Sequence, residues 1–164
     1  MTFFNIFSNK KINEKEKRKI IVDNREKNSL VVSELVKMGF VVGFEQLLVG
    51  DYMVNGVAVE RKTISDLKSS IVDKRIMSQL NELKQYPKHL LIVEGLDSAN
   101  IYSGGIHENA FRGFLLSTVF NFKTPMVFSI NEEDTAKYLG VIARKGDKNE
   151  KPINCGVTIY RGDP

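Results

Sequence analysis

The dipeptide Asn55-Gly56 lies between two short apolar runs, residues 51–54 and 57–61. Asn and Gly both tolerate a positive φ angle, and Asn-Gly between alternating apolar residues is the strongest short-range signal of a β-hairpin. The sequence therefore predicts two antiparallel strands joined by a two-residue turn. This turn also limits the fold, because it sets which residues of the two strands can face each other.

The register of the hairpin brings two acids together. A two-residue turn places Val54 opposite Val57, and counting back along the strands places Asp51 opposite Glu60. Directly opposed like charges lie roughly 5 Å apart at Cβ and destabilise a sheet, so something should compensate them. Lys62 projects from the same face as Glu60, because side chains alternate along a strand. The spacing predicts a cluster of two carboxylates and one amine.

This cluster has the chemistry of a divalent-metal site. Mg²⁺ and Mn²⁺ prefer hard oxygen ligands and commonly bind one or two carboxylates together with water and a substrate phosphate. A metal held by Asp51 and Glu60 would acidify water and neutralise phosphate charge, while Lys62 orients the nucleophile or stabilises the transition state. That combination predicts phosphodiester hydrolysis. A simpler interpretation is also open: Glu60 and Lys62 form a surface ion pair, and Asp51 is a turn residue after Gly50.

Strand-like and helix-like segments alternate along the chain, which the hydrophobic spacing shows. The expected strands cover residues 19–23, 40–48, 89–94 and 126–130, and the expected helices cover 29–38, 63–86, 107–121 and 131–144. This order predicts an α/β fold with a central mixed β-sheet flanked by helices, antiparallel at the hairpin and parallel at helical crossovers. We expect one domain at residues 19–145, between a disordered basic tail at 1–18 and a C-terminal extension or linker at 146–164 with a short strand at 156–160.

Capping residues mark the predicted helix ends. Gly39 should end the first helix, Thr63 should cap the second with Asp66 in the usual position of a capping-box Glu, and Asn131 should cap the last. The second helix should bury one apolar stripe: Ile64, Leu67, Ile71, Met77, Leu80 and Leu83. Six apolar residues of the last two helices are also expected in the core: Phe111, Phe114, Leu115, Val119, Leu139 and Ile142.

Composition narrows the function classes. The 164 residues are 42% apolar but contain no run long enough to span a membrane, so we expect a soluble domain. The net charge of +4 is concentrated in residues 1–19, which hold six of the 24 basic and two of the 20 acidic residues. A lone cysteine, Cys155, excludes an intramolecular disulfide and suits a reducing compartment. His89 and His107 have no partners at ligand spacing, so we expect structural roles and no zinc site.

The hairpin and its surroundings resemble a known nuclease family. Residues 50–66 are similar to the GD…ERKxxxD signature of the XPF family of structure-specific nucleases. Residues 23–26 resemble the family's DxRE strand end, and residues 70–75 with Gln79 resemble its first long helix. The resemblance covers residues 20–144 and is closest to the nuclease domain of archaeal Hef and XPF proteins. It implies a restriction-endonuclease-like fold with a (D/E)xK core.

The resemblance implies roles for the residues that match these motifs. Asp51 and Glu60 would be ligands of Mg²⁺ or Mn²⁺, Lys62 the catalytic lysine, and Asp23 a further acid at the metal. Arg61 would belong with the catalytic residues, although the alternation of side chains points it to the face opposite Glu60. The other matches would bind DNA or support the site: Arg25, Glu26, Asp66, Arg75 and Gln79. Simpler roles stay open for some of them, since Asp66 could only cap its helix and Arg25 could form a local ion pair with Glu26.

The activity that the resemblance implies is DNA cleavage near a junction between duplex and single strand, such as a 3′ flap or fork, in DNA repair or replication restart. The expected partners are branched DNA and a second copy of the chain. The expected location is the cytoplasm near the nucleoid, or the nucleus of a eukaryote. Two alternatives are a non-catalytic DNA-binding or scaffold subunit and a junction resolvase of the same broad fold.

Some features leave the DNA preference open. Lys74 stands where the family usually has Gly, and no helix-hairpin-helix segment follows residue 144 in this sequence. The loop at residues 97–105 is either a DNA-contacting lip or an ordinary connection.

Overall fold

The structure is a computed structural model that describes residues 19–97 and 99–145. Its strands are β1 (Lys19–Asp23), β2 (Val41–Glu45), β3 (Tyr52–Val54), β4 (Val57–Thr63), β5 (His89–Glu94) and β6 (Met126–Ser129). Its helices are the 3-10 helix η1 (Asn24–Glu26) and the α-helices α2 (Leu30–Lys37), α3 (Ile64–Val72), α4 (Arg75–Leu83), α5 (Glu108–Phe120) and α6 (Glu132–Arg144). The predicted tail, the predicted extension with its strand, and Cys155 lie outside the described residues.

The six strands form one mixed sheet in the order β2-β1-β3-β4-β5-β6. β1 is parallel to β2, and β4, β5 and β6 are parallel to one another, whereas β3 is antiparallel to both of its neighbours. The predicted hairpin register is confirmed, since Val54 pairs with Val57. Asn55 and Gly56 have φ angles of 49° and 75°, as a two-residue type I′ turn requires. The predicted α/β class with a central mixed sheet is therefore confirmed.

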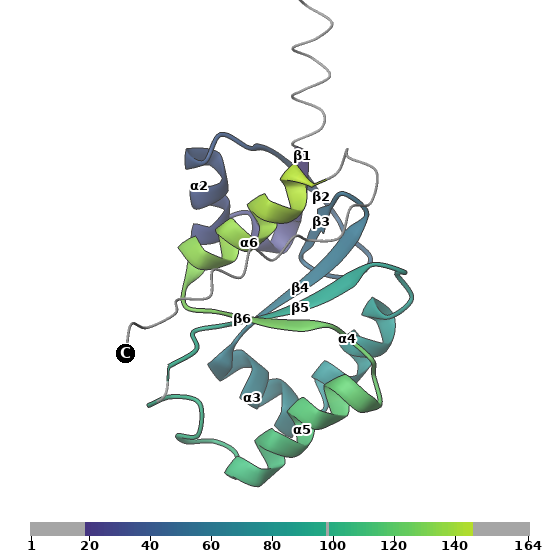
Figure 1. Cartoon of the computed structure of the whole chain (residues 1–164), viewed down its shortest axis with the longest axis vertical. Helices are drawn as coiled ribbons and strands as arrows, with labels where there is room; N and C mark the ends of the chain where they lie inside the picture. The colour runs from purple at the N-terminus through teal and green to yellow at the C-terminus, as the bar shows by residue number, and fades with distance from the viewer. Residues whose placement is uncertain (1–18, 98, 146–164) are drawn as a thin grey trace, which may run out of the picture.

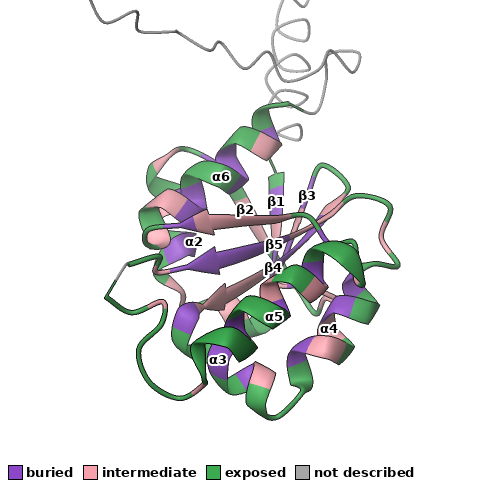
Figure 2. Ribbon diagram, turned by 60° about the horizontal axis from the view of Figure 1, so that its bottom comes forward, coloured by how far each residue is buried: buried purple, intermediate pink, exposed green. Residues whose placement is uncertain are grey.

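Helices cover both faces of the sheet and create two cores. In Figure 1, α2 and α6 lie on one side of the sheet, and α3, α4 and α5 lie on the other. Successive side chains of β5 point to opposite faces of the sheet. Ile92 packs in the core under α2 and α6, while Leu91 and Val93 pack in the core under α3, α4 and α5. Figure 2 shows buried residues both in the strands and in the helices that pack on them. No helix within the described ranges is both long enough and apolar enough to cross a membrane.

The prediction of a single long helix after the hairpin is wrong. Two helices, α3 and α4, occupy this stretch, and Lys74 between them has a φ angle of 62°, in the left-handed region that an α-helix excludes. The Asp73 side chain accepts the N–H of Arg75 at 3.1 Å and so helps to start the second helix. The break changes the helical phase. As a result Ile76 is fully buried, while Met77, predicted for the core, is only partly buried.

Two further predictions need correction. The strand expected over residues 40–48 is shorter, because the chain leaves the sheet after Glu45 and forms a loop that turns back toward β1. Val119 was expected in the core but is half exposed. It lies five residues after the buried Phe114, which places it on the outward face of α5.

The predicted helix ends and histidine roles agree with the structure. Gly39 follows α2 with a φ angle of 82°, and the side chains of Thr63 and Asn131 cap α3 and α6. His107 caps α5 with its ring, and the ring of His89 hydrogen-bonds to a backbone carbonyl at 2.7 Å. Both histidines are thus explained by local structure.

Candidate active site

Asp51 lies one residue before β3, where three hydrogen bonds fix it. Its N–H donates to the carbonyl of Val59 at 2.8 Å, and its own carbonyl accepts the N–H of Asp23 at 2.8 Å. Its carboxylate oxygen Oδ2 accepts the N–H of Arg61 at 2.9 Å. Gly50 precedes it with a φ angle of 76°, and a Cβ there would lie 2.9 Å from the Val59 carbonyl oxygen, so this approach requires glycine. The carboxylate is therefore held firmly beside β4.

Glu60 lies in the middle of β4 and is only 5% exposed. Its Oε1 accepts the side-chain amide of Gln79, from α4, at 2.8 Å and lies 3.1 Å from the Nζ of Lys62. The structure therefore brings Lys62 to Glu60 on one face of the strand. The ion pair of the simpler interpretation is present, but it does not lie at the surface, because both of its partners are largely buried.

Burial makes both acids difficult to ionise. It raises the pKa of Asp51 to about 7, and the nearby negative charge of Glu60 adds to this effect. Burial also raises the pKa of Glu60, and the Lys62 ammonium opposes that rise. Two neighbouring carboxylates that resist ionisation form a site that a cation would stabilise.

These side chains open into a pocket of about 520 Å³. Its lining also includes Arg25, Glu26, Asp66, Arg75 and Glu82. Two carboxylates beside open space fit a hard divalent cation that completes its coordination with water and phosphate oxygens. Within the described part of the chain, no three His, Cys, Asp or Glu side chains gather as a metal-binding group.

Asp23 lies at the end of β1, and the lining of the pocket does not include it. It is 1% exposed and caps η1, where its Oδ1 accepts both the N–H and the Nε of Arg25, at 2.9 and 2.6 Å. Its Oδ2 accepts the N–H of Leu47 at 2.8 Å. The hydrogen bond from Arg25 lowers the pKa of Asp23, against the effect of burial. Asp23 thus connects the loop before Asp51 to the end of β1. Arg25 forms its ion pair with Asp23, and not with Glu26 as the simpler interpretation suggested.

Arg61 points away from Glu60, as the strand alternation predicts. Its guanidinium binds Glu94, with Nε donating at 2.8 Å and Nη2 also paired, and its Nη1 lies 3.4 Å from the carboxylate of Glu26. Glu94 also accepts the hydroxyl of Thr135 at 2.6 Å. Most of this network is buried, although Arg61 and Glu26 also line the pocket. Sequence reasoning gave Glu94 and Thr135 no role, although an acid at the end of a buried strand signals a need for a partner.

Asp66 and Arg75 face the pocket from α3 and α4. The N–H of Asp66 donates to the Thr63 hydroxyl at 3.1 Å, so the cap is made by Thr63 and the Asp66 backbone. The Asp66 carboxylate lines the pocket. Arg75 is exposed at the rim, with its Nε 2.7 Å from Oδ2 of Asp73. Both residues can therefore meet a ligand in the pocket.

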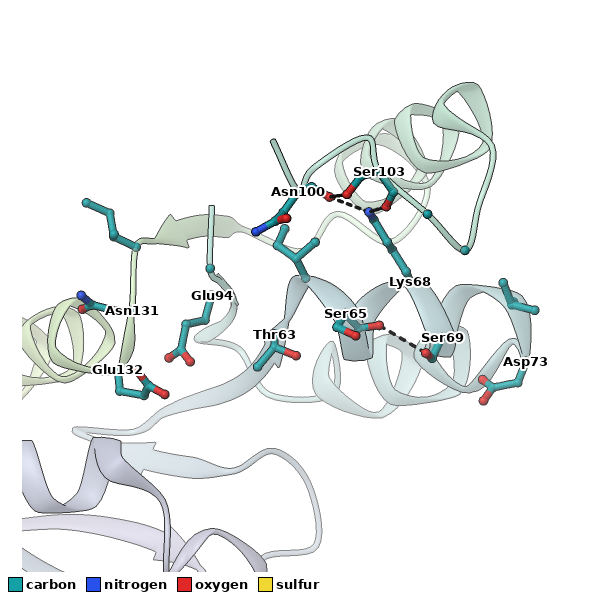
Figure 3. A pocket seen from close by; sticks show the side chains of 16 residues that line it. Thr63, Ser65, Lys68, Ser69, Asp73, Glu94, Asn100, Ser103, Asn131 and Glu132 are labelled. Carbon is teal, nitrogen blue, oxygen red and sulfur yellow. Dashed lines mark hydrogen bonds between the residues drawn. The ribbon is translucent and has the colours of Figure 1, made fainter. Parts of the chain in front are cut away.

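A second hollow, of about 950 Å³, lies at the carboxyl ends of β4, β5 and β6 and shares Thr63 with the first pocket (Figure 3). Lys68 lines it, but its ammonium donates to two carbonyl oxygens of the loop at residues 97–105. Three carboxylates also line it: Asp73, Glu94 and Glu132. The loop therefore fits the interpretation of an ordinary connection, braced by Lys68.

Comparison with known proteins identifies the family. Residues 22–142 match the ERCC4 domain, which covers the whole hairpin, both acids and Lys62. The chain belongs to the ERCC4/XPF nuclease family. The predicted family resemblance is confirmed, and the pocket at the hairpin is the candidate active site of an XPF-type nuclease domain.

Relatives of this domain are longer proteins. The 3′-flap repair endonuclease Xpf of Saccharolobus solfataricus is 36% identical over 138 residues, which cover 83% of this chain and 59% of that protein. A protein of Methanocaldococcus jannaschii whose assigned name is that of an ATP-dependent RNA helicase is 44% identical over 134 residues, covering 81% of this chain and 16% of that protein. The chain thus spans less than two thirds of either relative.

Solved structures of XPF from Aeropyrum pernix have the same fold. One structure matches with a TM-score of 0.70 and 30% identity, covering 77% of this chain and 63% of that chain. The structure in complex with DNA matches with a TM-score of 0.70 and 29% identity, covering 77% of this chain and 64% of that chain. The fold of this domain is therefore that of an XPF nuclease domain.

The raised pKa of Asp51 predicts a pH-dependent stability for this XPF-type domain without metal. A carboxyl whose pKa rises from 3.8 to about 7 on folding stabilises the fold fully below pH 3.8 and loses that contribution as the pH rises through 7. Asp51→Asn removes the titrating group. The difference in unfolding free energy between the variant and the parent should therefore grow in favour of Asp51→Asn from pH 5 to pH 8. Urea unfolding across this range checks it, and a constant difference would contradict the prediction.

Proposed function

We propose that this domain is a divalent-metal-dependent DNA endonuclease that hydrolyses phosphodiester bonds near junctions between duplex and single-stranded DNA. The observation that carries the proposal is the convergence of half-buried Asp51, buried Glu60 and Lys62 in an open pocket. The name of the Saccharolobus relative, a 3′-flap repair endonuclease, supports a 3′ flap as the substrate and DNA repair as the process. Replication forks are a second substrate of the same geometry.

Each of these pocket residues has a different role in hydrolysis. Asp51 and Glu60 would hold Mg²⁺ or Mn²⁺, and Gln79 keeps Glu60 in position through its 2.8 Å hydrogen bond. When bound, the cation supplies Lewis acidity that acidifies water and offsets charge on the phosphate. Lys62 orients the attacking water and stabilises negative charge that develops on the phosphate oxygens. The water oxygen forms a bond to phosphorus, the bond to the leaving oxygen breaks, and one proton passes to that oxygen.

The rim of the pocket favours a phosphate backbone. Arg25 and Arg75 are both exposed there, each held on one side by a single acid, Asp23 or Asp73. A guanidinium has five N–H donors in a fixed fork, so donors remain for phosphate oxygens after one such pair. We assign these two arginines to the DNA backbone on either side of the cleaved bond.

The test is a panel of end-labelled flap, fork, nicked, four-way and plain duplex DNAs, incubated with Mg²⁺ or Mn²⁺. Cleavage of flap or fork DNA near the junction supports the proposal, and no cleavage of any substrate with either metal contradicts it. Symmetric cleavage of the four-way junction would favour a junction resolvase. Tight, metal-independent flap binding without product would favour a non-catalytic scaffold, although Asp51, Glu60 and Lys62 are all present here.

We also propose a second copy of the chain as a partner. Leu116, Val119 and Phe120 are all exposed on α5, and their spacing of three and four residues forms one apolar stripe on its outer face. Light scattering at micromolar concentration should show a dimer, and Phe120→Glu should convert it to a monomer. Val36→Glu, at an exposed apolar position of α2, is the control and should leave the dimer intact. A monomeric parent would contradict this prediction.

A further inference from the structure

Leu48 is an apolar side chain at the mouth of the candidate active site. It is 91% exposed and lines the same pocket as Asp51 and Glu60. Single exposed leucines are normal on protein surfaces and need no explanation by themselves. Leu48 differs from an ordinary one because the pocket that it lines also contains the two acids that would hold the metal, Asp51 and Glu60. An exposed apolar side chain at this position is available to contact a substrate bound in the pocket.

The loop that carries Leu48 is anchored at both ends. Before it, the N–H of Leu47 donates to the buried carboxylate of Asp23 at 2.8 Å. After it, Val49 packs against the core under α3, α4 and α5, and Gly50 meets the Val59 carbonyl with no room for a Cβ. Val49 therefore turns inward and Leu48 outward on a fixed backbone. A fixed apolar contact loses little conformational entropy when it meets a ligand.

The distance along the chain limits what Leu48 can touch. Three residues of extended chain span at most about 11 Å. Successive nucleotides of one DNA strand rise about 3.4 Å. With a phosphate placed at Asp51, the Leu48 side chain therefore reaches no farther than about three nucleotides from the cleaved bond.

We infer that Leu48 packs against the face of the nucleobase next to the cleaved phosphate, at the point where the duplex ends. This inference rests on the proposed function. Nucleobase faces are the apolar part of DNA, and proteins commonly insert leucine and other apolar side chains against unstacked bases. Arg25, on the same pocket rim, would bind the phosphate while Leu48 covers the base. Arg25 and Leu48 together would set which phosphodiester bond of the strand is cleaved. Leu48 is therefore a positioning residue, which affects the cleavage site and the preferred substrate.

The experiment uses the full chain and a flap DNA with the fluorescent base 2-aminopurine at the nucleotide beside the junction. Unstacking changes the emission of this base, and the signal needs binding but no cleavage. The parent should change the emission, and Leu48→Ala should abolish the change. With Mg²⁺, Leu48→Ala should lower junction cleavage roughly tenfold and spread the cuts over neighbouring nucleotides. Leu48→Met should restore both readouts, since Met keeps an apolar side chain of similar length.

Leu30→Ala is the matched control, because Leu30 is 62% exposed on α2 and does not line the pocket. It should behave as the parent does. The same emission change, cut position and rate for Leu48→Ala and the parent would overturn the inference, as would a parent that binds the flap without any change in emission. A third result is a parent protein that changes the 2-aminopurine emission in a Leu48-dependent way but cuts no DNA. That result would refute the proposed nuclease function and still support the contact between Leu48 and the base.

Discussion

Asp51→Asn and Lys62→Ala should each lower the single-turnover rate of flap cleavage by about a thousandfold. Asn cannot supply the negative charge that a divalent cation requires, and Ala removes the ammonium that orients the nucleophile. Both losses should occur without loss of the fold. Asp51→Asn should in fact be more stable than the parent at pH 8 without metal, because burial opposes the ionised Asp51 carboxylate. The rates are measured on end-labelled flap DNA with Mg²⁺ in excess.

The combination of lost cleavage and unchanged or higher stability separates a catalytic role from a structural one. Asp97→Asn is the matched control, since Asp97 lies on an exposed loop away from the pocket lining. It should cut at the parental rate. Cleavage by Asp51→Asn within threefold of the parent would remove this acid from the proposed mechanism.

Arg61→Met should cost about 3–5 kcal/mol of the free energy of unfolding. Arg61 is the cation paired with Glu94, whose buried carboxylate has the Thr135 hydroxyl as a further partner. Removal of the guanidinium leaves that negative charge uncompensated. Urea unfolding followed by circular dichroism measures the loss. Adding Glu94→Gln to Arg61→Met should recover part of it, because a neutral amide is less costly to bury.

The control for this prediction is an ion pair at the surface. Arg112 and Glu108 pair at 3.0 Å on α5 with both side chains exposed. Because solvent screens exposed pairs, Arg112→Met should leave the unfolding midpoint unchanged. A midpoint for Arg61→Met as high as that of Arg112→Met would show that the buried network does not hold the sheet and helices together.

The features that could be predicted from sequence are those determined locally. Asn55-Gly56 determines its own turn, and the turn determines the register that brings Asp51 beside β4. The period of two then places Lys62 on the face of Glu60 and Arg61 on the other. The family resemblance rested on this segment together with the shorter motifs at residues 23–26 and 70–79. No packing information was needed for any of these steps.

The features that sequence reasoning missed depend on contacts between distant segments. Glu94 meets Arg61 only because β4 and β5 pair in parallel, and Thr135 joins them only because α6 begins over the end of that strand pair. The break at Lys74 was missed because its neighbours have helical periodicity on both sides. The place of Asp23 at the metal stays a prediction from a motif; what the motif did not show is that its two oxygens hold Arg25 and the loop before Asp51.

The central claim is that Asp51 and Glu60 together bind one divalent cation. Calorimetric titration of the DNA-free chain with Mn²⁺ at pH 8, above the pKa of about 7 for Asp51, tests it directly. We predict one site in the parent and in Asp97→Asn, with affinity lowered at least about tenfold in Asp51→Asn and in Glu60→Gln. Equal Mn²⁺ affinity in all four proteins would contradict the account.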